Sequence, residues 1–186
     1  MPERNKPFVL GIDPGPTESA YVLLNPELKP IAFEKTSNDE LVTNALLAIA
    51  GHGIGQFGES IDVAIEMVAS YGMPVGRDVF ETCVWIGRFW ERLEKFQKKT
   101  FVYRREEKIT ICHSPKANDA TIRQALVDRF AHGYSNHGKG TKDNPSVFYG
   151  FKRDCWQAMA VAVTYHDKYL CKEETADDLH LEDLPF

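Results

Sequence analysis

A chain of 186 residues has the length of one compact domain, which excludes two-domain kinases and other large multidomain enzymes. Its 43% hydrophobic and 26% charged residues are ordinary values for a globular protein and exclude a chain that is disordered throughout. No apolar run approaches the roughly 18 residues of a membrane span, and no apolar signal segment follows the charged N-terminus. The four cysteines lack the paired spacings of a zinc site or redox motif. We therefore expect a soluble, cytoplasmic protein without membrane contact.

The formal net charge of −5 is unevenly distributed along the chain. Six of the 27 acids lie in residues 173–186, where there is no Lys or Arg, which leaves 21 acids against 22 bases in the rest of the chain. We expect residues 1–172 to form one domain and residues 173–186 to form a disordered acidic tail. Eight bases lie between Arg88 and Lys108. The overall charge therefore does not exclude a polyanionic partner.

Short apolar runs separated by Gly, Pro and Asn predict three strands, at residues 8–13, 20–25 and 30–35, joined as an antiparallel meander. Residues 37–39 are typical of a helix start, and the helix that follows ends at the glycines after Ile49. A buried strand is predicted over residues 61–66. Because a helix separates it from the meander, this strand should have a parallel neighbour in the sheet.

The second half of the chain is predicted to hold a long, buried helix over residues 77–97, where apolar residues recur at helical spacing. Residues 100–104 and 108–112 resemble strands, and Asn118 is the expected cap of a second helix. A third helix should start near Asp154. The stretch between the last two helices is rich in Gly, His, Lys and Asn and is predicted to be a long loop.

Three acids stand out by their positions. Asp13 ends the first strand, Glu66 ends the later buried strand, and Asp154 opens the final helix. Neighbouring parallel strands are only about 4.8 Å apart, so carboxylates at matching strand ends can share metal ions. Carboxylates without nitrogen or sulfur ligands favour hard ions such as Mg²⁺ and Mn²⁺. Each acid alone could equally cap a turn or a helix, so the metal hypothesis depends on the three together.

The runs GIDPGPTESAYVLL, AIEMVASYG and DCWQAMAVAVTYH resemble the RuvC-type Holliday junction resolvases of the RNase H-like superfamily, particularly their shorter phage and prophage forms. The resemblance extends from Phe8 to Lys172. It implies an α/β, RNase H-like fold with a mixed five-stranded sheet flanked by helices. It also implies that Asp13, Glu66 and Asp154 bind Mg²⁺, which Mn²⁺ can replace, in a two-metal phosphodiesterase. The expected protein is a homodimer that resolves four-way DNA junctions in recombination and repair, in a bacterial or phage-infected cell.

The sequence departs from the family pattern on the final helix. Many resolvases present a second carboxylate one turn after the first, and here Gln157 stands three residues after Asp154. The spacing places both side chains on one face of the helix. A neutral amide is a weaker metal ligand, so as a fourth catalytic residue Gln157 would bind a metal-bound water or DNA. An ordinary surface or interface residue is the alternative.

Candidate DNA contacts come from three regions. Four bases at spacings of 4, 3 and 4, from Arg88 to Lys99, would line one face of the long helix and follow phosphates, although a solvated face is an equal alternative. The family carries a basic residue near the scissile phosphate and an aromatic residue that stacks at the junction centre. The expected DNA-contacting residues are Tyr71, Met73, Arg88, Arg92, Lys116, Arg123, Lys139 and Lys142. The broad apolar stripe of the long helix is either a dimer interface or core packing.

Three other functions compete with the resolvase. The run GIDPGPTES also resembles the phosphate-binding strand of actin-like sugar kinases and chaperone ATPases, but those proteins need two such domains and this chain is too short. A non-catalytic nucleic-acid-binding module remains an alternative because of Gln157. A third reading is an RNase H-like nuclease that acts on hybrids or flaps.

Overall fold

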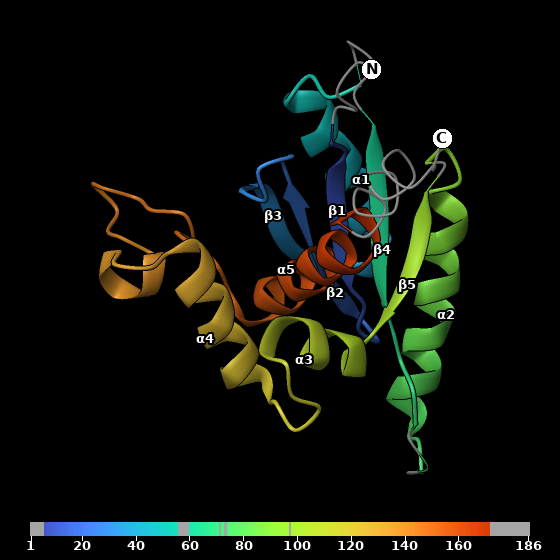
Figure 1. Ribbon diagram of the computed structural model, residues 1–186. Helices are drawn as coiled ribbons and strands as arrows, with labels where there is room; N and C mark the ends of the chain where they lie inside the picture. The colour runs from blue at the N-terminus through green and yellow to red at the C-terminus, as the bar shows by residue number, and fades with distance from the viewer. Residues whose placement is uncertain (1–5, 56–59, 71, 73, 97, 172–186) are drawn as a thin grey trace, which may run out of the picture.

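The computed structural model describes residues 6–55, 60–70, 72, 74–96 and 98–171, which are built around one mixed sheet of five strands (Figure 1). The strands lie in the order β3-β2-β1-β4-β5. Their bounds are β1 Phe8–Asp13, β2 Glu18–Leu24, β3 Pro30–Ser37, β4 Ile61–Met67 and β5 Lys99–Tyr103. The first three strands pair antiparallel, whereas β4 pairs parallel with both β1 and β5. The predicted meander and the parallel neighbour are both confirmed.

Alternation along the strands divides the core into two layers, one on each face of the sheet. Leu10 and Ile12 of β1 pack with α1 (Asn38–Gly51) and α2 (Arg77–Arg92), the two helices that link parallel strands. Val9 of β1 and Ala64 of β4 pack on the opposite face with α4 (Asp119–Phe130) and α5 (Arg153–Tyr165). Since side chains alternate, Asp13 and Glu66 belong to the α5 face.

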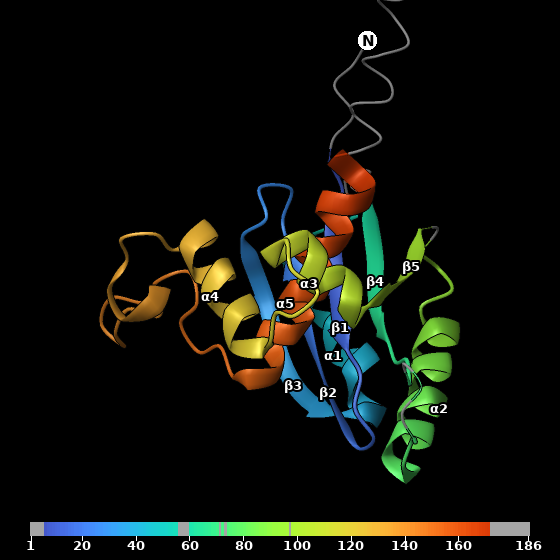
Figure 2. The same ribbon diagram turned by 60° about the horizontal axis from the view of Figure 1, so that its bottom comes forward.

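Helix α5 lies across that face of the sheet, with α3 (Arg104–Cys112) and α4 beside it (Figures 1 and 2). Gly11 allows the close approach, because a Cβ atom there would lie 2.3 Å from the main-chain oxygen of Ala158. The other end of α5 is fixed by a buried hydrogen bond from the hydroxyl of Tyr165 to Asp62 of β4, at 2.9 Å. A π-helical turn, η2 (His166–Leu170), continues the chain. None of the described helices combines the length and the hydropathy of a membrane span.

Two sequence predictions about secondary structure are wrong. Residues 108–112 form the end of α3 and not a strand, because the Glu106 side chain accepts a hydrogen bond from the Tyr103 main-chain NH and starts a helix there. Helix α2 ends at Arg92, so the expected row of bases is not continuous on one helix: Lys95 follows the helix and Lys99 belongs to β5.

Two further expectations agree with the structure. Asn118 caps α4 through its side chain, which accepts a hydrogen bond from the Thr121 main-chain NH at 3.0 Å. The segment between α4 and α5 holds only one short 3₁₀ helix, η1 (Ser135–Gly138), but it packs Phe148 and Phe151 into the core. The predicted acidic tail, 173–186, lies outside the described residues.

Candidate active site

Asp13 and Glu66 lie side by side at the carboxyl ends of adjacent strands. The parallel register pairs Ile12 with Ile65, which makes the two acids the next pair in line. They are within hydrogen-bonding reach of each other. Burial, followed by the charge of Glu66, raises the pKa of Asp13 well above its usual range. Burial also raises the pKa of Glu66, although the hydrogen bond with Asp13 partly offsets this. The two acids are therefore costly to ionise together, and a bound cation would lower that cost.

Asp154 approaches the same site from the first turn of α5. Its charge contributes to the raised pKa of Asp13. The ammonium group of Lys35 lies 2.8 Å from the Asp154 carboxylate and 3.1 Å from that of Glu18, which holds the two acids on either side of it. The structure thus brings together the three acids identified from the sequence, one from each of β1, β4 and α5.

A cavity of about 260 Å³ opens beside Asp13. Its lining comes from the loop after β1, from β2 and β3, and from α5: Asp13, Pro14, Gly15, Pro16, Thr17, Glu18, Ser19, Lys35 and Asp154. The loop is fixed by the buried Ser19 and Asn38. The Gly15 NH donates to the Ser19 hydroxyl at 3.0 Å, this hydroxyl donates to the Asn38 side chain, and the Asn38 amide donates to the Gly15 carbonyl at 2.9 Å. The carboxylates therefore stand at the edge of a cavity with a well-ordered wall.

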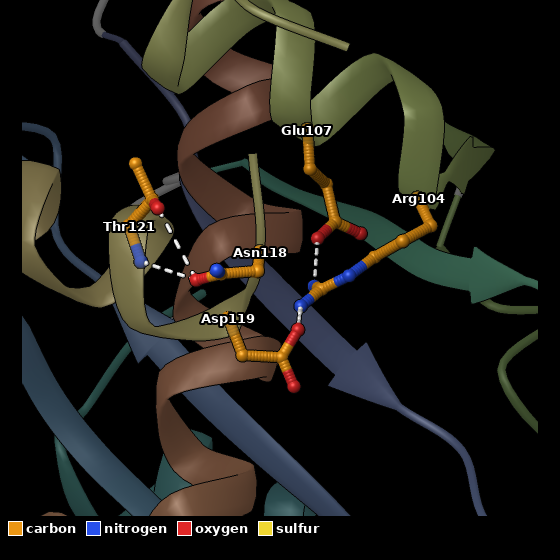
Figure 3. A network of polar contacts seen from close by, with 5 residues as sticks. All are labelled: Arg104, Glu107, Asn118, Asp119 and Thr121. Carbon is orange, nitrogen blue, oxygen red and sulfur yellow. Dashed lines mark hydrogen bonds and ion pairs between the residues drawn. The ribbon is translucent and has the colours of Figure 1, made fainter. Parts of the chain in front are cut away.

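A fourth acid, Glu107 on α3, was missed by the sequence analysis. Its side chain is fully buried, and one carboxylate oxygen, Oε1, has no hydrogen-bond partner within the described part of the chain. The other oxygen accepts a hydrogen bond from Arg104, and Figure 3 shows the Arg104 guanidinium between the carboxylates of Glu107 and Asp119. Burial, followed by the charge of Glu66, raises the pKa of Glu107 well above its usual range.

A sequence signal for Glu107 existed just before residues 108–112, which the sequence pattern predicts as a strand. Glu106 and Glu107 are consecutive acids that follow Tyr103 at the spacing of a capping box, which is typical of the first turn of a helix. Tyr is not among the usual cap residues, so the signal was weak.

Gln157 lies one turn after Asp154 on α5 and is partly buried. The expected DNA contacts fall into separate groups. Lys116 and Arg123 are exposed on the side of the sheet that carries the acids, and the Arg123 guanidinium stacks on Trp156 with 5.1 Å to the ring centroid.

The other expected DNA contacts are not brought to the acids in the same way. Arg88 and Arg92 are on α2, across the sheet from the acids. Lys142 is exposed and Lys139 half-buried in the segment before α5. Tyr71 and Met73 lie outside the described residues.

A different cluster has the spacing of a single metal ion. Within the described ranges, the group of His, Cys, Asp or Glu side chains whose ligand atoms all lie within 4.8 Å of one another is His166, Asp167 and Cys171. It lies at the far end of α5 from Asp154. Arg129 already binds both oxygens of Asp167. Although burial opposes it, hydrogen bonds from His166 and Arg129 lower the pKa of Asp167 to about 2. This cluster is an ion-paired helix end.

No protein-family model matches the chain, and no curated protein matches it by sequence. Two structures of RuvC are among the solved structures that share its fold. Thermus thermophilus RuvC in complex with a Holliday junction substrate aligns with a TM-score of 0.62 and 12% identity, over 89% of this chain and 96% of that one. A second structure of Thermus thermophilus RuvC aligns with a TM-score of 0.58 and 16% identity over the same shares. The chain therefore has the RNase H-like fold of RuvC, and the fold class predicted from the sequence is confirmed.

Proposed function

We propose that this protein is a divalent-metal-dependent endonuclease that cleaves branched DNA, and four-way junctions in particular, by two-metal hydrolysis of phosphodiesters. The observation that carries the proposal is the convergence of Asp13, Glu66 and Asp154 from three separate elements of a RuvC-like fold. Acids are costly to bury together, since each raises the pKa of its neighbours. A site that brings cations to these acids offsets that cost.

The donor set suits Mg²⁺ or Mn²⁺. Every candidate ligand is a carboxylate oxygen, which hard cations prefer. Near this site, the oxygen Oε1 of Glu107 is buried and has no hydrogen-bond partner among the described residues. Within the described residues, no three acids around Asp13 have ligand atoms that all lie within 4.8 Å of one another. Metal-dependent hydrolysis of phosphodiesters commonly uses a pair of ions roughly 3.5–4 Å apart. Such ions, when bound, would supply charge neutralisation at the phosphate and a nucleophile at neutral pH.

Each residue of the site then has a separate role. Asp13 and Glu66, side by side at the ends of adjacent parallel strands, would bind the cations. Lys35 keeps the Asp154 carboxylate at the cavity edge. Lys116 and Arg123, exposed on the same face of the sheet, would contact phosphates and fix the orientation of the DNA. Gln157, one turn from Asp154, would bind water or DNA rather than an ion.

The outer face of α2 supports a homodimer. Phe80 and Val84, one turn apart, are 61% and 55% exposed, and Gly87 continues their stripe with open space around its Cα. Exposed apolar stripes of this kind mark interaction surfaces. A second copy of the chain that packs there would create a two-fold axis, which matches a four-way junction that presents two equivalent strands.

Gln157 keeps one alternative open. A module that binds nucleic acid without cutting it needs no fourth acid, and Gln157 occupies the position where many resolvases carry one. Cleavage of flaps or of RNA–DNA hybrids by the same acids is a second alternative, since the metal chemistry is common to all of these substrates.

A cleavage assay separates these functions. A four-way junction, a flap, an RNA–DNA hybrid and a duplex are each incubated with Mg²⁺, Mn²⁺ or EDTA. We expect metal-dependent nicks on the junction, no cleavage by Asp13→Asn, and junction affinity in EDTA that is unchanged in this variant. The Lys29→Ala variant, in the exposed turn before β3, is a matched control that should cleave normally. Undiminished cleavage by Asp13→Asn would refute the catalytic role, and preferred cleavage of the hybrid or flap would favour the alternative substrates.

A further inference from the structure

Glu107 is an unusual residue for the interior of a protein. Its side chain has no solvent exposure, yet one carboxylate oxygen lacks a hydrogen-bond partner within the described residues. Buried carboxylates are normally paired and bonded at both oxygens, because an unsatisfied polar atom loses its hydration without compensation. An apolar side chain of similar size would avoid this cost. Packing alone therefore does not account for Glu107.

Among the described residues, the cation bonded to Glu107 is Arg104, and it is shared with other acids. Arg104 binds the Oε2 atom of Glu107 and the carboxylate of Asp119 at the same time, and its charge also acts on Glu66 (Figure 3). The guanidinium of Arg104 thus interacts with three acids. Asp119 is half exposed, whereas the Glu107 side chain has no solvent exposure, so Glu107 is the acid that solvent compensates least.

Glu107 also lies near Glu66 and Asp13 of the candidate metal site. Its charge acts on both Glu66 and Asp13, although it comes from a different helix. Arg104 holds the Oε2 side of its carboxylate, which leaves Oε1 as the oxygen available to a ligand. The hydrogen bond from Arg104 fixes the carboxylate in the way that outer hydrogen bonds orient metal ligands.

We propose that Glu107 is the fourth acid of the metal site, and that its Oε1 atom binds one of the divalent ions or a water molecule in the shell of that ion. Helix α3 then supplies the carboxylate that α5 lacks at Gln157. The inference rests on the proposed metal-dependent nuclease, but it concerns a residue and an element that the sequence pattern did not indicate. Arg104 acts as a positioning residue that orients the Glu107 carboxylate.

The test is a titration of the metal-free protein with Mn²⁺, followed by calorimetry and by the rise in melting temperature, in four forms of the full chain. These are the unaltered protein, Asp13→Asn, Glu107→Gln and Asp119→Asn. Gln keeps the size of Glu107 and an acceptor for Arg104, but it is a poor ligand for a hard ion. Asp119→Asn perturbs the same Arg104 from its other side, so it is the matched control for effects transmitted through the guanidinium.

We expect Glu107→Gln to lose one binding event or to bind Mn²⁺ about tenfold more weakly, with a smaller metal-induced rise in melting temperature. Asp119→Asn should behave like the unaltered protein. Equal weakening by Asp119→Asn and Glu107→Gln would overturn the proposal. The proposal would also be overturned if Glu107→Gln lowered the melting temperature of the metal-free protein but kept the full metal-induced rise, since Glu107 would then contribute only to the stability of the fold. If Asp13→Asn itself keeps full Mn²⁺ binding, the proposed metal site fails as a whole, which distinguishes the two failures.

Discussion

Gly11→Ala should damage the site more than it damages the fold. The added Cβ atom would lie 2.3 Å from the Ala158 main-chain oxygen and 2.8 Å from the Ala162 Cβ atom. Ordinary contacts begin near 3.4 Å, so α5 must move away from β1 by roughly 1 Å. Overpacking of this kind costs about 1–3 kcal/mol. For a chain of this size each kcal/mol lowers the melting temperature by about 2–4 °C, which gives a fall of about 2–12 °C.

The effect on cleavage should be larger, because α5 carries Asp154. A displacement of roughly 1 Å between catalytic groups can cost about 100-fold in rate. Junction cleavage is measured at 25 °C, well below both melting temperatures, alongside thermal unfolding followed by circular dichroism. Gly51→Ala, at the end of α1 with open space around the added methyl group, is the control and should leave the cleavage rate unchanged. Normal cleavage and an unchanged melting temperature in Gly11→Ala would refute the close approach of α5 to β1.

Three further outcomes are expected. In EDTA, Asp13→Asn should raise the melting temperature at pH 7.5 but not at pH 4.5. Because the pKa of Asp13 is raised in the folded state, protonation of Asp13 stabilises the fold at low pH. This stability is lost as the pH rises through the folded pKa. Identical pH profiles for the variant and the unaltered protein would contradict this. In light scattering, Phe80→Glu should convert the proposed dimer to a monomer, whereas Leu47→Glu, at a similarly exposed position on α1, should not. The same oligomeric state in both variants would count against the α2 interface. Deletion of residues 173–186 should tighten duplex binding at low salt and have little effect at high salt, and equal affinities across the salt series would show that the tail does not act on DNA.

Strand positions could be predicted because side chains alternate between the two faces of a strand and because Pro, Gly and Asn mark the strand ends. The runs around Phe8–Asp13 and Ile61–Met67 are apolar on both faces, which is typical of strands at the centre of a sheet. The same rule failed at residues 108–112. There Ile109 and Ile111 alternate with polar residues, and five residues are too few to separate a strand from one turn and a half of helix.

The acids of the candidate site also differ in how far the sequence predicts them. Asp13 and Glu66 could be predicted because the hydrogen-bond register of two adjacent parallel strands fixes where both acids end. Asp154 and Glu107 reach the site through helices, and a helix is placed by packing that a local pattern does not encode. Asp154 was singled out by its place at the start of the final helix and by the family resemblance, whereas Glu107 had only a weak helix-start signal and was not found.

This division predicts where the site is most easily disturbed. The Asp13–Glu66 pair is tied to the sheet by main-chain hydrogen bonds, which a single substitution rarely shifts. The other two acids depend on how α5 and α3 rest on that sheet, and α5 contacts β1 most closely at Gly11. Substitutions under these helices should therefore alter the spacing of the acids and reduce cleavage while the sheet, and with it most of the stability, remains intact.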